Sequence, residues 1–312
     1  MCCLFGFVDY GHQLSRKARH RLLSVLSTAC EERGTDATGI VYNTDGRQHI
    51  FKRPIPAHLM WYRVPVDATI VMGHTRMTTQ GSALRNENNH PFQGQILGGR
   101  GKIAKFALAH NGVLYNDKKI RKEFKLPGSR IETDSYVAVQ MLEQLGRMDF
   151  EGLRAMAEEL EGSYTITALT ERDELYFVKG NNPMCIYHYP AAKLYVYAST
   201  EEILKKAMLQ AQLPLGKAEK INLLSGEILR IDAWGKITRS HFDDSRLYSA
   251  YSFPWPKWNG YETVNPPYAD DSNYLEDLKS VAVFYGLYPE DIDALIEDGV
   301  DPMEIEEMLY CG

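Results

Sequence analysis

The chain begins with MCCLFGFVDYGH, residues 1–12. Residues 3–10 mix aromatic, β-branched and other apolar side chains and run into Gly11, a pattern typical of a β-strand. No basic residue precedes the apolar run and Asp9 interrupts it, which argues against a secretory signal. We therefore expect a strand at the start of the chain, with Cys2 directly before it.

Cys2 could act as a catalytic residue because of its position. A small second residue permits removal of Met1, which would leave Cys2 with both a thiol and an α-amine. These groups ordinarily have pKa values of about 8.5 and about 7.7–8.0. One residue could then supply a nucleophile and its base. Position alone is a weak indication, because any residue can stand second by chance.

Strand-like runs recur as far as about residue 240, separated by three segments with helical periodicity, 14–34, 133–149 and 150–162. The strands outnumber the helices, and the helices fall in pairs. This organisation predicts sheets packed on each other and covered by helices.

Composition excludes several classes of protein. The chain is 44% apolar and 24% charged with a net charge of −6, so neither nucleic acid nor a membrane surface is an expected partner. Its apolar runs are far shorter than the roughly 20 residues that span a bilayer. The 5 cysteines have irregular spacing without CxxC, so we expect no disulfide framework and no metal site. We expect a cytoplasmic globular protein that needs no cofactor.

Composition changes after residue 245. Residues 246–272 are rich in Pro, Tyr, Trp and Asp without a period, and we interpret them as a linker that contacts the main domain. Residues 273–312 predict a small acidic helical module, in which GLYPEDI (286–292) is echoed by GVDPMEI (299–305). Two interpretations stay open, namely short helices packed on one another and a docking module for a partner.

Four further segments carry polar residues in an ordered series: ERGTDATGI (32–40), GHTRMTTQG (73–81), NNHPF (88–92) with AHNGVLYN (109–116), and ETDSYVA (132–138). Together with Cys2 they resemble the class II glutamine amidotransferases, in particular the glutaminase domain of glucosamine-6-phosphate synthase. The resemblance covers roughly residues 2–240. Each motif alone is weak, but the ordered set is specific.

The resemblance implies the α+β class and a four-layer αββα sandwich of the N-terminal-nucleophile hydrolases, with a small helical C-terminal appendage. It implies a glutaminase domain over residues 2–245, which hydrolyses the side-chain amide of glutamine. Cys2 would form a thioester, and Asn111 and Gly112 would donate to the oxyanion. The alternative for Asn111 and Gly112 is an ordinary Asn-Gly hairpin turn.

Three residues match the family's contacts with the ends of glutamine. Arg76 would bind the α-carboxylate through its guanidinium fork, with help from the hydroxyl of Thr79. Asp134 would pair with the α-ammonium. Taken alone, Arg76 and Asp134 are also what a surface salt bridge would use.

Other residues in the motifs suggest structural roles. The loop residues Arg33, Gly34, Asp36 and Gly39 fit turn formation, His74 and His90 fit hydrogen-bonded internal histidines, and Cys30 fits the core. Three positions depart from the family's pattern: Cys3 replaces Gly, Met77 replaces Trp and Gln80 replaces His. Only residue 2 can carry the α-amine, so we assign catalysis to Cys2 and packing to Cys3.

No acceptor domain is recognisable in the sequence, which has no sugar isomerase repeats, phosphoribosyltransferase loop or P-loop. We therefore expect either a partner protein that accepts the ammonia or a stand-alone glutaminase or amidohydrolase, and a homo-oligomer stays open. Two alternatives remain: an N-terminal-nucleophile amidase for a different amide, which a substrate panel would separate, and a glutamine-binding sensor or scaffold without turnover.

Overall fold

The computed structural model describes residues 2–97, 103–247, 278, 279, 282, 288–300, 302 and 305. The chain divides into two compact units, Met1–Phe253 and Pro254–Gly312. Nearly all of the linker predicted over 246–272, and much of the repeat after it, lie outside the described residues.

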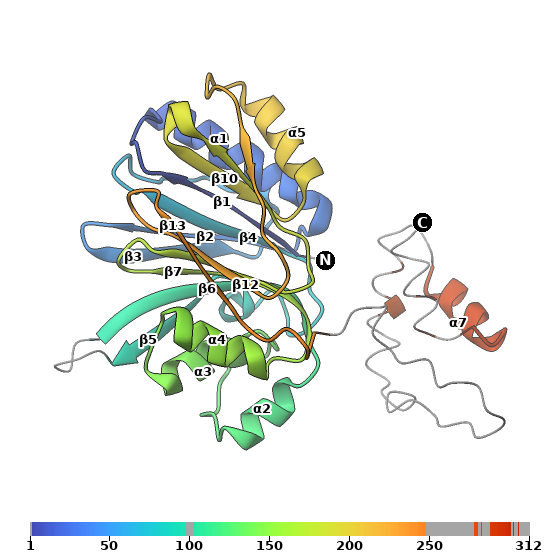
Figure 1. Ribbon diagram of the computed structural model, residues 1–312. Coiled ribbons are helices and arrows are strands. Elements are labelled where there is room, and N and C mark those ends of the chain that lie inside the picture. The colour runs from blue at the N-terminus through green and yellow to red at the C-terminus, as the bar shows by residue number, and fades with distance from the viewer. Residues whose placement is uncertain are drawn as a thin grey trace. The chain divides into compact units, whose positions relative to one another are not determined.

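Within the described part of the first unit, the strands form two antiparallel sheets (Figure 1). The seven-stranded sheet has the order β11-β9-β10-β1-β4-β2-β3, and the six-stranded sheet has the order β13-β12-β8-β7-β6-β5. The strands are β1 (Cys3–Asp9), β2 (Ala37–Thr44), β3 (Arg47–Arg53), β4 (Ile70–Arg76), β5 (Phe92–Leu97), β6 (Ile103–Leu114), β7 (Gly162–Thr170), β8 (Leu175–Lys179), β9 (Cys185–Tyr189), β10 (Leu194–Ala198), β11 (Glu219–Ile221), β12 (Glu227–Ile231) and β13 (Ile237–His241).

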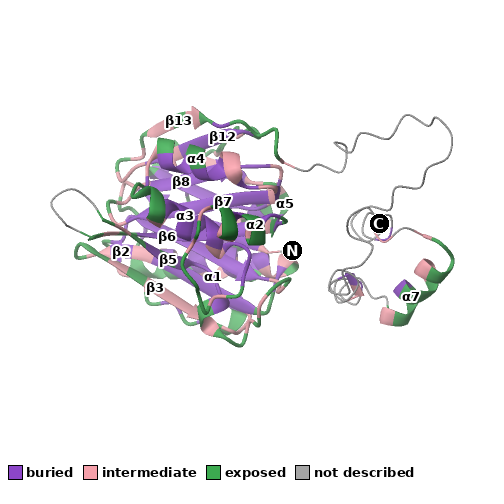
Figure 2. Ribbon diagram, turned by 90° about the horizontal axis from the view of Figure 1, so that it is seen from below, coloured by how far each residue is buried: buried purple, intermediate pink, exposed green. Residues whose placement is uncertain are grey.

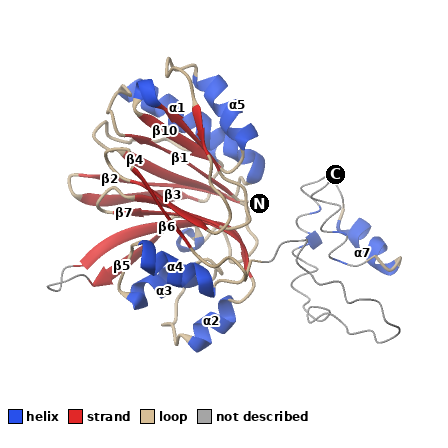
Figure 3. Ribbon diagram, in the orientation of Figure 1, coloured by secondary structure: helices blue, strands red, loops and turns tan. Residues whose placement is uncertain are grey.

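Helices cover the outer face of each sheet (Figure 3). They are α1 (Arg16–Ala29) and α5 (Glu201–Ala211) on the seven-stranded sheet, with α2 (Asp117–Glu123), α3 (Tyr136–Leu145) and α4 (Phe150–Glu159) on the side of the six-stranded sheet. Short 3₁₀ helices lie at Cys30–Arg33, Ala57–Leu59, Asn86–Asn88 and Pro190–Ala192. The predicted four-layer αββα sandwich is confirmed.

Strand β1 shows why the sequence folds this way. All of its residues are buried, and alternate side chains face opposite layers. Leu4 and Val8 belong to the core between the two sheets, whereas Phe5 and Phe7 pack in the layer under α1 and α5. A strand buried on both faces is apolar throughout, as residues 3–8 are. Figure 2 shows the same burial across the central strands of both sheets.

The three predicted helices begin or end close to their expected positions. The segment 14–34 forms α1, which starts after the N-cap Ser15 and continues as a 3₁₀ helix from Cys30. α3 ends at Gly146 in the left-handed conformation, and α4 starts after the N-cap Asp149. α2 and α5 were not predicted.

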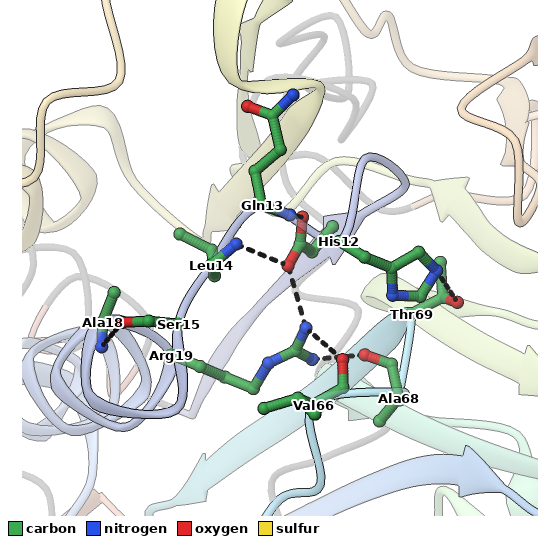
Figure 4. Close-up of polar contacts among 10 residues, drawn as sticks. His12, Gln13, Leu14, Ser15, Ala18, Arg19, Val66, Ala68 and Thr69 are labelled. Atoms are coloured by element: carbon green, nitrogen blue, oxygen red, sulfur yellow. Dashed lines mark hydrogen bonds and ion pairs between the residues drawn. The ribbon is translucent and has the colours of Figure 1, made fainter.

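A buried ion pair fastens the end of β1 to α1 (Figure 4). Arg19 Nη2 lies 2.8 Å from Asp9 Oδ2, with the side chains 1% and 0% exposed. Asp9 also accepts from the N–H groups of Gln13 and Leu14, and Arg19 donates to the carbonyl of Ala68. The pair therefore fixes the turn after β1 against the loop that leads into β4.

Replacement of Arg19 by methionine is expected to lower the free energy of unfolding by about 3–5 kcal/mol, because it leaves the buried Asp9 carboxylate without its cation. Urea unfolding followed by circular dichroism measures the change. The control is Arg21→Met on the exposed side of the same helix, for which we expect a loss within about 0.5 kcal/mol. Similar losses in both variants would contradict the role of the ion pair.

The second unit contains α7 (Pro289–Glu297), which begins at the first Pro of the predicted repeat. The N–H of Tyr288 donates to Asp291 Oδ2 at 2.6 Å, which caps the helix. Ile292 packs with Leu278, Ala282 and Ile305 in a small apolar cluster. Among all described residues, no helix is both long and apolar enough to cross a membrane.

Candidate active site

Cys2 lies directly before the first residue of the central strand β1, beside the loop that follows β4. Cys3 pairs with Thr75 of β4, which places Cys2 beside the residues that follow Thr75 in the chain. The Cys2 Sγ atom accepts from Met77 N–H at 3.4 Å and lies 3.3 Å from the Met77 carbonyl oxygen. Burial raises the pKa of the Cys2 thiol, and the Met77 hydrogen bond and the charge of Arg76 oppose this rise. The thiol therefore needs a base to become a nucleophile.

One cavity contains most of the predicted site. Its empty volume is about 250 Å³, including its open mouth. It is lined by Cys2, Arg76, Met77, Thr79, Gln80, His90, His110, Gly112, Thr133, Asp134 and Ser135. Five of the six residues predicted from the sequence are among them, and the exception is Asn111.

Arg76 ends β4 and is only 3% exposed. Its Nη1 donates to Asn89 Oδ1 at 2.7 Å, and its Nη2 donates to the carbonyls of Gln80 and Gly81 at 2.6 and 2.8 Å. The guanidinium group therefore holds the loop 77–81 around the cavity. Most of its fork is used inside the protein, which leaves fewer N–H groups for a ligand than the sequence suggested.

Asp134 faces the cavity from the segment before α3. It is 5% exposed, and its carboxylate accepts from the N–H groups of Leu114 and Ser135 at 2.6 and 2.8 Å. The first of these contacts connects it to β6. The surface salt bridge considered from the sequence does not occur, because Asp134 is buried and its carboxylate is held by main-chain donors.

Asn111 and Gly112 lie inside the long strand β6, so the hairpin interpretation is wrong. Gly112 has φ +126°, and a Cβ atom there would lie 1.7 Å from the Ser163 carbonyl oxygen and 2.5 Å from Asn182 Nδ2. Only glycine fits this position. The backbone of Gly112 lines the cavity, which Cys2 and Asp134 also line. Both residues lie 20 positions or more from Gly112 in the sequence.

Asn111 is not among the residues that line the cavity, and its amide group contacts the segment directly after β10 in the other sheet. It is 1% exposed, and its Nδ2 donates to Ser199 Oγ at 2.6 Å. Its Oδ1 is buried and has no hydrogen-bond partner within the described part of the chain. A role at the oxyanion stays a prediction for this residue.

Comparisons with known proteins agree with this geometry. Residues 96–206 match the family model described as a glutamine amidotransferase domain. The chain is 31% identical over 194 residues to the isomerizing glutamine–fructose-6-phosphate aminotransferase of Geobacillus kaustophilus, which is 60% of this chain and 30% of the relative. The same enzyme of Staphylococcus aureus is 30% identical over 195 residues, with the same shares. Over these residues the chain is similar to the class II glutamine amidotransferases.

A solved structure supports the fold. The glutamine phosphoribosylpyrophosphate amidotransferase of B. subtilis has a TM-score of 0.59 and 21% identity, over 78% of this chain and 49% of that chain. At this identity the likeness concerns the fold. The match to the curated relatives covers 30% of their length, so it concerns one part of those longer proteins.

The loop 32–40 supports the site without lining the cavity. Arg33 Nε donates to the Cys2 carbonyl at 3.0 Å, and Asp36 Oδ2 accepts from Thr78 N–H at 2.7 Å. A Cβ atom on Gly34 would lie 2.5 Å from the backbone of Arg76. These contacts agree with the supporting role expected for this loop.

Cys3 faces the opposite layer from the cavity. Its thiol is fully buried and lies 2.9 Å from the Cys30 sulfur, where the end of α1 packs on β1. Both cysteines belong to the core under α1 and α5, which confirms the packing role expected for Cys3 and Cys30.

Three buried histidines lie close together, and two of them, His90 and His110, line the cavity. The ring of His90 lies 4.3 Å from that of His74 and 6.4 Å from that of His110, measured between centroids. His74 Nε2 contacts the His110 carbonyl at 3.1 Å, whereas neither ring nitrogen of His90 has a partner among the described residues. The expectation of a hydrogen-bonded histidine is therefore wrong for His90. Burial lowers the pKa of all three, and that of His74 to about 3.

These histidines predict a loss of stability in mild acid. Because the folded pKa of His74 lies below the unfolded value of about 6.5, the unfolded chain binds more protons below that pH. The stabilisation is complete above about pH 6.5 and is lost as the pH falls toward 3, by up to about 1.4 kcal/mol per pH unit for each histidine. Urea unfolding at pH 7 and 5.5 should show a smaller pH slope for His74→Gln than for the parent chain. Equal slopes in the two proteins would contradict this account.

Proposed function

We propose that the protein hydrolyses the side-chain amide of glutamine to glutamate and ammonia, with Cys2 as the nucleophile after removal of Met1. The observation that carries this proposal is the convergence of Cys2, Arg76, Gly112 and Asp134 on one cavity. They come from the start of β1, the end of β4, the interior of β6 and the segment before α3. Their combination offers a thiol, a cation, a backbone donor and an anion to one small ligand.

In the proposed reaction the α-amine of Cys2 takes the thiol proton, because the buried thiol has a raised pKa. The sulfur attacks the δ-carbon, and the Gly112 N–H and the Asn111 amide stabilise the oxyanion. The amine then protonates the leaving nitrogen, the C–N bond breaks and ammonia departs. Water attacks the γ-glutamyl thioester, which releases glutamate and restores the thiol.

The two charged ends of the amino acid are assigned to the remaining residues. Asp134 is a buried carboxylate at the cavity and suits the α-ammonium group. Thr79 and the N–H groups of Arg76 that the loop does not use suit the α-carboxylate. Met77 and Gln80 also line the cavity, so both departures from the family's pattern lie beside the substrate.

The ammonia acceptor is proposed to belong to another protein. The glutaminase domain is proposed to span residues 2–245, with 246–272 as linker and 273–312 as an acidic module for docking or packing. A cytoplasmic location and the absence of any cofactor remain predictions.

A substrate panel tests the proposed function. Release of glutamate and ammonia from glutamine, but not from N-acylated amino acids, is the expected result, and a diazo-ketone analogue of glutamine should label Cys2. Faster hydrolysis of another amide would favour the amidase alternative. Binding of glutamine without turnover by a chain shown by mass spectrometry to begin at Cys2 would favour a sensor.

A further inference from the structure

Ser199 lies directly after β10, beside the start of β1. Its side chain is 0% exposed. In the antiparallel register, Phe5 stands opposite Ala198, which places Ser199 next to Leu4. The proposed reaction gives this hydroxyl group no direct chemical task, yet its contacts lead to two parts of the site.

The Ser199 hydroxyl oxygen accepts hydrogen bonds from both sheets. The N–H of Leu4 donates at 2.9 Å, and Asn111 Nδ2 donates at 2.6 Å. Leu4 belongs to β1, two residues after Cys2, and Asn111 belongs to β6, directly before Gly112. One buried oxygen atom therefore joins the strand that follows the nucleophile to the strand that carries the predicted oxyanion donors.

This contact determines how the Asn111 amide is oriented. The amide nitrogen has two hydrogens, of which Ser199 accepts one, and the buried Oδ1 has no partner in the part of the chain that the structure describes. The Ser199 oxygen accepts from Leu4 and from Asn111, and it engages one of the two hydrogens of the Asn111 amide.

We propose that Ser199 is a positioning residue for glutamine hydrolysis, which holds the Asn111 amide in the orientation that donates to the oxyanion. The inference rests on the proposed function. Without the hydroxyl, the Asn111 N–H would lose its buried acceptor, and the amide could turn its oxygen toward the reacting carbonyl. The transition state would then lose a donor, while the contacts with the two ends of glutamine would be kept.

A double-mutant cycle on the full chain tests this role. We expect Ser199→Ala to lower kcat by about tenfold or more with KM changed less than about threefold, because the donor acts in the transition state. In the Asn111→Ala background the same substitution should change kcat less than about twofold, since no amide remains to be oriented. Steady-state kinetics of ammonia release measures all four proteins.

Two further variants separate positioning from folding. Ser27→Ala is the matched control, because Ser27 is also 0% exposed but donates to Ser24 within α1, and its kcat should be unchanged. If Ser199→Ala does not fold, Ser199→Cys takes its place with the same expectation, because the thiol has a similar size and is a weak acceptor.

Losses that are equal in the two backgrounds, or an unchanged kcat for Ser199→Ala, would overturn the role of Ser199 and leave glutamine hydrolysis intact. A wild-type chain that begins at Cys2 and releases no ammonia from glutamine would overturn the proposed function, and the positioning role with it. The two failures are therefore distinguishable from the wild-type rate alone.

Discussion

Replacement of Cys2 by alanine is expected to abolish ammonia release from glutamine, with kcat lowered by about 10⁴-fold or more. Among the described residues that line the cavity, Cys2 is the one thiol, so no other side chain there replaces it as a sulfur nucleophile. The fold should persist, because Cys2 lies before β1 and is only partly buried. Ammonia release and thermal unfolding, measured on the same preparation, check both expectations.

The neighbouring cysteine is the matched control. Cys3→Ala removes a fully buried thiol from the core under α1, so it should lower stability by about 1 kcal/mol and leave kcat within about threefold. A chain that retains Met1 should be as inactive as Cys2→Ala, because its α-amine does not belong to Cys2. Activity that survives in Cys2→Ala and disappears in Cys3→Ala would reverse the assignment.

Gly112→Ala is expected to lower kcat by about 10²-fold or more and the free energy of unfolding by about 1–3 kcal/mol. The added methyl group would meet the Ser163 carbonyl oxygen at 1.7 Å, and φ +126° is a conformation that alanine avoids. The strand must shift, and the shift moves the backbone N–H that is assigned to the oxyanion.

The control for this variant is Gly128→Ala, at an exposed position where a Cβ atom meets nothing within 4 Å. Its kcat and stability should stay close to those of the parent chain. A Gly112→Ala protein that keeps full activity would show that the β6 backbone does not contact the reacting carbonyl.

Much of the fold was predictable because it depends on patterns that are local in sequence. The apolar run 3–10 indicated a strand, and the periodicity of 14–34 indicated a helix. The helix α5 was missed although Ile203, Leu204 and Ala207 follow a helical period after the N-cap Thr200.

The candidate site was predictable as a set of residues and less so as a geometry. The motifs named Arg76 and Asn111, but not that Arg76 bonds its own loop or that Asn111 turns toward Ser199. The latter contact joins residues 88 positions apart, and no local pattern encodes it. His90 shows the same limit, because a buried histidine without a partner cannot be told from a hydrogen-bonded one by residue type.

The central place of β1 has a consequence for the order of events during synthesis. Its neighbour β10 ends at residue 198, so that edge of β1 stays unpaired until Ala198, the partner of Phe5, has been synthesised. At the usual 5–20 residues per second, this interval is roughly 10–40 s. Over that time one border of β1 has no partner strand, and Asn111 lacks its contact with Ser199. Topology alone thus delays the completion of the candidate site until the sandwich is nearly complete.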